Sequence, residues 1–215
     1  MNDSILQEPL GEIIADKLRR KIWNRELQFG ERLLESDLSN EYDVSRSTIR
    51  EALKILEYEE MVVSKARKGT YVAPFSKKDW KEIIELRALI ESHAFVLAIP
   101  RLNTDHFSQL YLILEEMKEQ SDNQNWNDLF DLDMKFHSYV VNLSGNSRII
   151  KIYNSIQVQI RTFLLLLNDY YSSTTVFYNE HKELLEALLS KDPKIVDKCV
   201  RNHIEYVEEQ WIAGT

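Results

Sequence analysis

The segment from residue 44 to residue 56 constrains the fold of this chain more than any other part of it. At helical spacing one side of the segment is apolar and consists of Ile49, Ala52, Leu53 and Leu56. The opposite side carries cations four residues apart, namely Arg46, Arg50 and Lys54. Three like charges at this spacing repel one another, and an arginine in the first turn opposes the helix dipole. The segment fits a solvated amphipathic helix and, equally well, a helix whose cationic side faces an anion such as a phosphate backbone.

The neighbouring segments favour the nucleic-acid interpretation. Residues 35–42 have the pattern of a short helix that only two residues separate from the cationic helix, and Ser45 is a candidate N-cap. In a helix-turn-helix of this layout, the N-terminal side chains of the second helix reach base edges in the major groove. Residues 61–64 and 70–73 are short β-prone runs joined by a basic segment, in which Gly69 can take the positive φ of a tight turn. The sequence therefore predicts a winged helix-turn-helix.

Residues 9–73 resemble the winged helix-turn-helix of the gluconate-repressor (GntR) family of bacterial transcription regulators. The matching positions are Leu27, Gly30, Glu31, Leu33, Leu38, Val44, Ser45, Arg46, Ile49, Arg50, Glu51, Ala52, Leu53, Leu56 and residues 68–72. Two positions depart from the family pattern: Phe29 stands where the family usually has proline, and Glu60 where it usually has glycine. Both departures concern turn geometry. The residues expected to contact DNA are Ser36, Ser45, Arg46, Ser47, Thr48, Arg50, Lys54, Arg67, Lys68 and Gly69.

The formal net charge of −8 argues against a nucleic-acid partner until its distribution is considered. Residues 1–75 carry 12 cations and 14 anions, so most of the acidity lies in residues 76–215. Residues 44–72 carry six cations and four anions, so the predicted DNA-facing segment is locally basic. The acidic remainder discourages nonspecific binding to DNA.

A chain of 215 residues with 44% apolar content fits two small domains. No apolar run approaches the ~20 residues of a membrane span and the polar start is not a secretory signal, so we expect a cytoplasmic protein without a membrane partner. The single cysteine, Cys199, excludes an intramolecular disulfide and a zinc-finger spacing. Because Pro74 breaks the chain before a new N-cap candidate, we predict a DNA-binding domain over residues 1–73, a linker over 74–78 and a second domain over 79–215.

The second domain is predicted to be an all-helical bundle. From residue 76 onward no strand alternation is visible, and breakers divide the sequence into about six helices. The breakers are Pro100 with Asn103 or Thr104, and residues 120–125, 144–146, 169–175 and 191–193. The predicted fold class is therefore mainly α: an N-terminal winged helix-turn-helix with a small β-wing, followed by a helical bundle.

Three of these helices carry metal-type ligands on the faces predicted to point inward. Asp133 and His137 are one turn apart on one helix, and His181 and His203 each share the apolar face of a later helix. Any one of them, taken alone, is more often a satisfied core residue. Unpaired buried polar groups cost about 1–3 kcal/mol each, so four of them on inward faces favour convergence on a shared ion.

The same residues resemble the all-helical ligand-binding domain (FCD) of the fatty-acid-regulator branch of the GntR family. The matching segments are residues 87–91, 133–137, 144–146, 180–182 and 203–205. In metal-containing members, an aspartate and three histidines bind a divalent ion beneath an effector cavity, so the resemblance implies the ligands Asp133, His137, His181 and His203. The acyl-CoA-binding members lack this set, which argues against a fatty-acyl thioester effector.

An imidazole-rich set with one carboxylate suits a first-row divalent ion; zinc is the first choice, with nickel, manganese and iron as alternatives. Open positions on such an ion can take an effector carboxylate, and Arg87 is a candidate for pairing with that carboxylate. An ion pair between Arg87 and Glu91, one turn apart, has equal weight. Arg161 is a second candidate of the same kind.

The whole sequence predicts a ligand-responsive transcription regulator, a repressor, that binds a palindromic operator in double-stranded DNA as a homodimer. A metal-dependent hydrolase is the alternative from another class, because a histidine-rich site with open positions can activate water. The lack of an identifiable inward base beside the four ligands weakens that alternative. A third interpretation is a constitutive DNA-binding protein with a structural metal.

Overall fold

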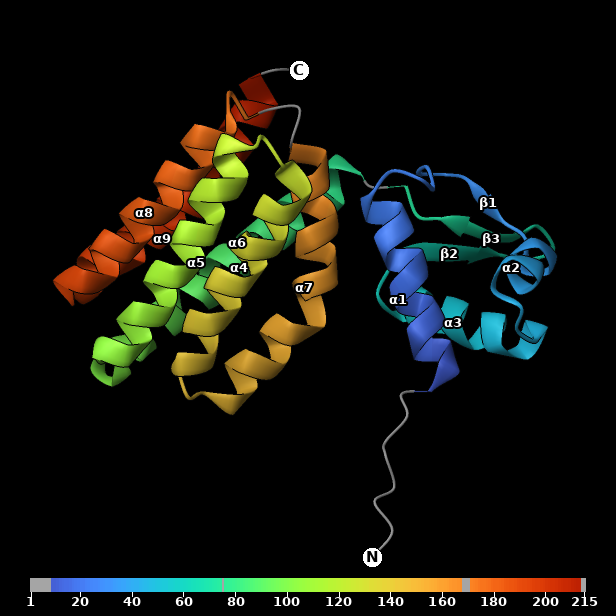
Figure 1. The fold of residues 1–215 in the computed structure, drawn as a ribbon, viewed down its shortest axis with the longest axis horizontal. Coiled ribbons are helices and arrows are strands. Elements are labelled where there is room, and N and C mark those ends of the chain that lie inside the picture. Colours follow the sequence, from blue (N-terminus) through green and yellow to red (C-terminus); the bar gives the residue numbers. More distant parts are fainter. Residues whose placement is uncertain (1–8, 75, 168–170, 214–215) are drawn as a thin grey trace, which may run out of the picture. The chain divides into compact units, whose positions relative to one another are not determined.

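The computed structural model describes residues 9–74, 76–167 and 171–213, and the chain divides into two compact units, residues 1–75 and 76–215. Figure 1 draws the first unit in blue to teal and the second in green to red. Residue 75, in the predicted linker, and residues 169–170, in a predicted break between two helices, lie outside the described residues.

The first unit is a winged helix-turn-helix. Its helices are α1 (Leu10–Trp23), α2 (Glu35–Tyr42) and α3 (Arg46–Tyr58), and its strands are β1 (Arg32–Leu33), β2 (Val62–Lys65) and β3 (Gly69–Val72). The strands form an antiparallel sheet in the order β1-β3-β2. The wing predicted from two strands is thus extended by β1, whose two residues are too short a run for alternation to be recognised.

Helix α3 begins where the sequence places its cap. The Ser45 hydroxyl accepts a hydrogen bond from the backbone N–H of Thr48 at 3.2 Å, which satisfies one free donor of the first turn. The predicted apolar side of α3 is buried and consists of Ile49, Ala52, Leu53 and Leu56. It packs on α1, whose buried residues include Ile14, Leu18 and Ile22. This packing leaves the cationic side of α3 exposed.

Glu60 adopts the backbone conformation for which the family usually has glycine. Its φ of +60° lies in the left-handed region, which costs a residue with a Cβ about 1–2 kcal/mol. The chain nevertheless turns there, because the backbone N–H of Met61 donates to the carbonyl of Leu56 at 2.9 Å and the Met61 side chain is buried. The departure at Glu60 therefore places strain in the turn between α3 and β2.

The second unit contains six α-helices among the residues that the structure describes. They are α4 (Lys77–Ala98), α5 (Thr104–Asp122), α6 (Trp126–Leu143), α7 (Ser147–Leu167), α8 (Thr174–Ser190) and α9 (Pro193–Ala213), with the 3₁₀ turn η1 (Ile99–Arg101) after α4. Ser76 opens α4 through a capping box with Asp79. The predicted fold class and number of bundle helices are confirmed.

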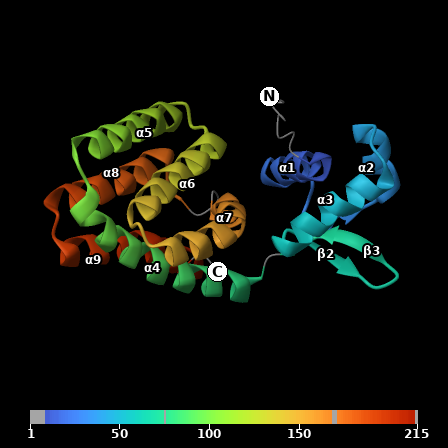
Figure 2. The same ribbon diagram turned by 90° about the horizontal axis from the view of Figure 1, so that it is seen from below.

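Helix α4 is the central element of this bundle. It packs against α6, α7 and α9, while α8 packs against α5 and α9. Figure 2 shows α5 and α8 side by side, with α6 next to them. Buried side chains of α4, α6, α8 and α9 therefore share one interior. None of the helices within the described ranges combines the length and apolar content that crossing a membrane requires.

Candidate metal centre and DNA-binding face

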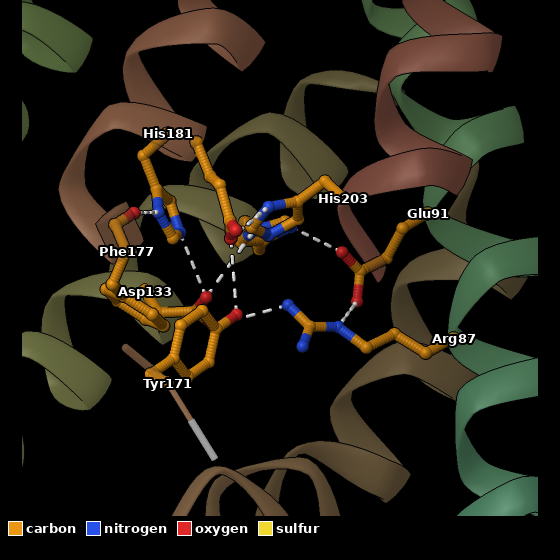
Figure 3. A network of polar contacts seen from close by, with 9 residues as sticks. Arg87, Glu91, Asp133, Tyr171, Phe177, His181 and His203 are labelled. Atoms are coloured by element: carbon orange, nitrogen blue, oxygen red, sulfur yellow. Dashed lines mark hydrogen bonds and ion pairs between the residues drawn. The ribbon is translucent and has the colours of Figure 1, made fainter. Parts of the chain in front are cut away.

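Four polar side chains from three helices meet in the interior of the second unit. Asp133 and His137 come from α6, His181 from α8 and His203 from α9, and one ligand atom of each lies within 4.8 Å of the others. Figure 3 labels Asp133, His181 and His203 of this group. Three of the side chains are fully buried and His203 is 8% exposed. The structure brings together all four residues predicted as ligands, and it forms no other such group of His, Cys, Asp and Glu within the described ranges.

The Nε2 atoms of the histidines converge near the Asp133 carboxylate. Oδ1 of Asp133 lies 2.9 Å from His181 Nε2 and 3.7 Å from His137 Nε2. The Nε2 atoms of His137 and His203 are 3.2 Å apart. Ligand atoms around a tetrahedral zinc ion are about 3.4 Å apart at bond lengths of about 2.1 Å. The spacing of the four atoms is therefore close to that of a coordination sphere.

The second ring nitrogen of each histidine, Nδ1, faces an oxygen outside the cluster. The pairs are His181 with the Phe177 carbonyl oxygen at 2.9 Å, His137 with the Glu91 carboxylate, and His203 with Glu180 Oε2 at 3.5 Å. An oxygen at Nδ1 favours the tautomer that carries the proton there and leaves the lone pair on Nε2. Three imidazole lone pairs and one carboxylate then point into the same space, which is a donor set that first-row divalent ions prefer.

Helix α4 contributes a guanidinium and a carboxylate to the same network. Arg87 donates through Nε to Glu91 at 2.6 Å and through Nη2 to Asp133 at 3.2 Å. Burial raises the pKa of the Asp133 carboxyl, but Arg87 and His137 outweigh burial and hold that pKa well below its ordinary value. Arg87 likewise outweighs burial at Glu91, whose pKa is also lowered. One cation thus faces two buried carboxylates, and the remaining negative charge favours a bound cation.

On the α8 side the cluster meets Glu180 and Tyr171. Burial raises the pKa of Glu180 to about 7, and its Oε2 accepts a hydrogen bond from the Tyr171 hydroxyl at 3.2 Å. Burial, together with the neighbouring His181 and His137, lowers the pKa of His203 well below its ordinary value. His203 is therefore neutral at pH 7, with a lone pair available for a metal ion.

The two arginines predicted to bind an effector are both engaged with protein acceptors. Arg87 forms the ion pair with Glu91 that the sequence offered as an alternative, and it also contacts Asp133. Arg161 on α7 donates to Asp131 Oδ1 at 2.6 Å and to the Asn127 carbonyl at 3.1 Å. An effector-binding role for either arginine stays a prediction.

Sequence reasoning missed Glu91 and Glu180 as partners of the cluster histidines. A signal for Glu91 was present, because Ile84, Arg87 and Glu91 follow one another at i, i+3 and i+7 on one side of α4, and all three are buried. Glu180 directly precedes His181, and helical spacing does not place two adjacent residues on one face. Its contact is instead with His203 on the neighbouring helix.

The residues predicted to contact DNA lie at three places in the first unit. They are Ser36 at the start of α2; Ser45, Arg46, Ser47, Thr48, Arg50 and Lys54 at the start and along the polar side of α3; and Arg67, Lys68 and Gly69 in the turn between β2 and β3. Arg67 and Gly69 both have positive φ, at +60° and +100°, which shapes this turn. The basic side chains of α3 and of the turn between β2 and β3 are exposed, and Ser36 is half-buried.

Arg50 is held by a carboxylate from the preceding helix. Its Nε donates to both oxygens of Glu35, at 3.0 and 2.8 Å. A hollow of about 190 Å³ adjoins the pair and is lined by Leu53, Lys54 and Glu57 of α3, Ser64 of β2 and Thr70 of β3. The polar side of α3 and the wing strands therefore share one surface, on which Glu35 fixes the direction of Arg50.

A winged helix-turn-helix with an exposed cationic helix, joined in one chain to a helical unit with a buried polar cluster, defines a two-domain DNA-binding regulator. Residues 10–72 match the model described as bacterial regulatory proteins, gntR family, and residues 82–206 match the FCD domain. The chain belongs to the GntR family of bacterial transcription regulators, in the branch that carries an FCD domain, as the sequence predicted.

Known relatives agree with this assignment. The chain is 29% identical over 213 residues to the gluconate operon transcriptional repressor of Bacillus licheniformis, covering 94% of this chain and 87% of the repressor. The structure of Escherichia coli McbR/YncC has the same fold, with a TM-score of 0.80 and 18% identity over 97% of this chain and 100% of that one. A metal-free FCD domain of the regulator TM0439 matches 66% of this chain and 96% of its own, with a TM-score of 0.51 and 24% identity. The family and the named repressor are regulators, which confirms the prediction that the protein is not an enzyme.

Proposed function

We propose that this protein is a repressor that binds a palindromic operator as a homodimer, and that its helical domain holds one divalent ion at Asp133, His137, His181 and His203. A small carboxylate effector acts at this site and changes operator affinity. Zinc is the proposed ion, with nickel, manganese and iron as alternatives.

The observation that carries the metal proposal is the convergence of four buried ligand atoms within 4.8 Å. Without a cation, the Nε2 lone pairs of His137 and His203 oppose each other at 3.2 Å whenever both rings carry their proton on Nδ1. The network also holds two carboxylates, those of Asp133 and Glu91, against one guanidinium. A divalent ion relieves both conflicts. If the ion expands its coordination beyond the four protein ligands, the added position would offer a carboxylate oxygen a place to bind.

Two observations support a carboxylate effector: the name of a related repressor and the kind of ligand that the proposed ion accepts. The B. licheniformis repressor is named for the gluconate operon, and gluconate is a small hydroxy-carboxylate. An anion with a carboxylate and adjacent hydroxyls can chelate an ion that has open positions. The effector of this chain is therefore proposed to belong to the same chemical class.

The homodimer proposal rests on the geometry of DNA reading. One recognition helix reads one half-site, and two copies related by a two-fold axis read a palindrome one helical turn apart. The single α3 of this chain, with Arg46, Arg50 and Lys54 exposed, supplies one such half. The proposed role as a repressor is based on the B. licheniformis relative, which is named a transcriptional repressor.

The proposal is tested by operator titration on DNA fragments that the purified full chain selects from genomic DNA. Gluconate and other small carboxylates are added to zinc-loaded and to chelator-treated protein, and operator affinity is measured by fluorescence anisotropy. We expect at least one carboxylate to change affinity by about 5–150-fold in zinc-loaded protein and to have no effect after chelation. The His181→Ala variant should lose the response, whereas His93→Ala, an exposed histidine on α4, should keep it. A response that survives metal removal contradicts the proposal.

A purely structural metal is the second candidate, and one observation favours it. Arg87, the predicted partner of an effector carboxylate, is buried and already paired with Glu91 and Asp133. In that case chelation lowers the melting temperature, and no carboxylate changes operator affinity in either form of the protein.

A further inference from the structure

A groove runs between α8 and α9 on the surface of the helical unit. Its volume is about 350 Å³, and it is lined by Val176, Asn179, Glu180 and Glu183 of α8 and by Cys199, Asn202 and His203 of α9. Six waters occupy about 180 Å³ at the density of liquid water, so the groove has room for a hydrated ion. Apart from His203, none of these lining residues is a proposed metal ligand or a proposed contact to DNA or effector.

The groove shares one residue, His203, with the buried cluster. Asp133, His137 and His181 are fully buried, whereas His203 is 8% exposed and belongs both to the cluster and to the wall of the groove. A buried metal site requires an entry path. His203 is the cluster member that this path would reach first.

The lining of the groove offers ligands to a hydrated cation without forming a closed site. Two carboxylates, two side-chain amides and one thiol face the groove, and oxygen and sulfur are both ligands for first-row ions. Glu183 is exposed and increases the negative charge at this surface. Within the described ranges Glu180, Glu183 and Cys199 do not form a second group of three metal-type ligands. Such a surface attracts a cation and releases it again.

His203 is held more loosely than the other two histidines. The His181 ring is fixed at Nδ1 by the Phe177 carbonyl at 2.9 Å, and the His137 ring by Glu91. Nδ1 of His203 instead faces Glu180 Oε2 at 3.5 Å, which is a longer contact than those of the other two rings. Rotation of His203 therefore disturbs a weaker contact than rotation of either other ring.

We infer that the groove between α8 and α9 is the path by which a divalent cation enters and leaves the buried cluster, with Glu183 attracting the ion and His203 as the gate. This inference rests on the proposed metal site. According to this inference, the rate of metal exchange depends on Glu183, Glu180 and His203. This rate is a property separate from DNA binding.

The single cysteine of the chain makes the path directly testable, because a thiol-specific reagent reacts at Cys199 alone. Metal-free full-length protein is treated with benzyl methanethiosulfonate, whose disulfide places a bulky group in the groove, and labelling is verified by mass. Cobalt(II) uptake is then followed by stopped-flow absorbance, and release by a chelator chase. We expect both rates to fall by about tenfold or more at unchanged stoichiometry, and to recover when a reductant removes the label. The Cys199→Ser variant, treated identically, should show no change.

A charge variant provides the second measurement. Glu183→Gln should slow cobalt(II) uptake by about threefold or more at low salt, because local negative charge raises the encounter rate of cations. Glu186→Gln is the matched control, since Glu186 is an exposed glutamate on the same helix outside the groove. If the label lowers the stoichiometry by distorting the cluster, this pair of variants decides the question.

The outcomes separate the path from the site. If cobalt binds at one ion per chain and its rates are equal in labelled and unlabelled protein, the proposed path is wrong and the metal site still holds. Equal rates in Glu183→Gln and Glu186→Gln lead to the same conclusion. Wild-type protein that takes up no cobalt overturns both.

Discussion

Glu91→Gln should weaken both metal binding and the helical unit, although Glu91 is not among the proposed ligands. Glu91 is fully buried between Arg87, whose Nε lies 2.6 Å away, and Nδ1 of His137. Glutamine keeps the shape and removes the charge. Removing one partner of a buried ion pair costs about 3–5 kcal/mol, and we expect about 3 kcal/mol here because Arg87 keeps its contact with Asp133. At about 3 °C per kcal/mol, the melting temperature falls by about 10 °C.

The effect of Glu91→Gln on the metal follows from its position behind His137. Partners that orient a metal-binding histidine are worth about 10–100-fold in affinity, or about 1.4–2.7 kcal/mol. Zinc affinity is measured by competition with a chromophoric chelator, and stability by thermal melting of metal-loaded and metal-free protein. The control is Glu85→Gln, an exposed glutamate on the same helix paired with Lys81 at 3.8 Å, which should change neither quantity appreciably. Zinc affinity within twofold of wild type, with a melting temperature equal to that of Glu85→Gln, would refute the network described around His137.

Three further predictions concern the DNA-binding unit. Glu60→Gly should stabilise it by about 1 kcal/mol relative to Glu60→Ala in urea unfolding, because only glycine removes the Cβ from a residue with φ of +60°; equal stability of the two variants would show that the turn is unstrained. Arg46→Ala and Arg50→Ala should each weaken operator binding by about 1–3 kcal/mol in anisotropy titrations if the guanidinium contacts a base. Wild-type operator affinity in both variants would contradict the placement of α3 in the major groove. Lys68→Ala should weaken all DNA sequences equally and reduce the salt slope of log K by about 1; a loss confined to one sequence would contradict its assignment to phosphate.

Local patterns in the sequence predicted most of the fold. The stripe from Ile49 to Leu56 and the cap at Ser45 each depend on residues a few positions apart, and each lies in the structure as expected. The N-cap expected after Pro74 is Ser76. Strand β1 was not predicted, because its two residues pair with β3, about forty positions away, and carry no periodicity of their own. The strain at Glu60 became visible only with its backbone angle.

The candidate site was predicted as a set of inward-facing residues and not as a network. Helical spacing indicates which way Asp133, His137, His181 and His203 point, and the structure brings them together. Spacing does not indicate which residues of two helices lie at the same height, so the contact between Glu91 and His137 could not be predicted. The groove beside His203 depends on the packing of α8 against α9. The residue pattern within either helix alone does not predict this packing.

The central claim, that the buried cluster is a metal site, is tested most directly by the metal content of purified full-length protein. After incubation with zinc and gel filtration, elemental analysis by plasma mass spectrometry should find one ion per chain in wild type and in His93→Ala. The double variant His181→Ala/His203→Ala should retain less than a tenth of that amount, since it lacks two of the four ligands. A full complement of zinc in the double variant, or none in wild type, would contradict the account.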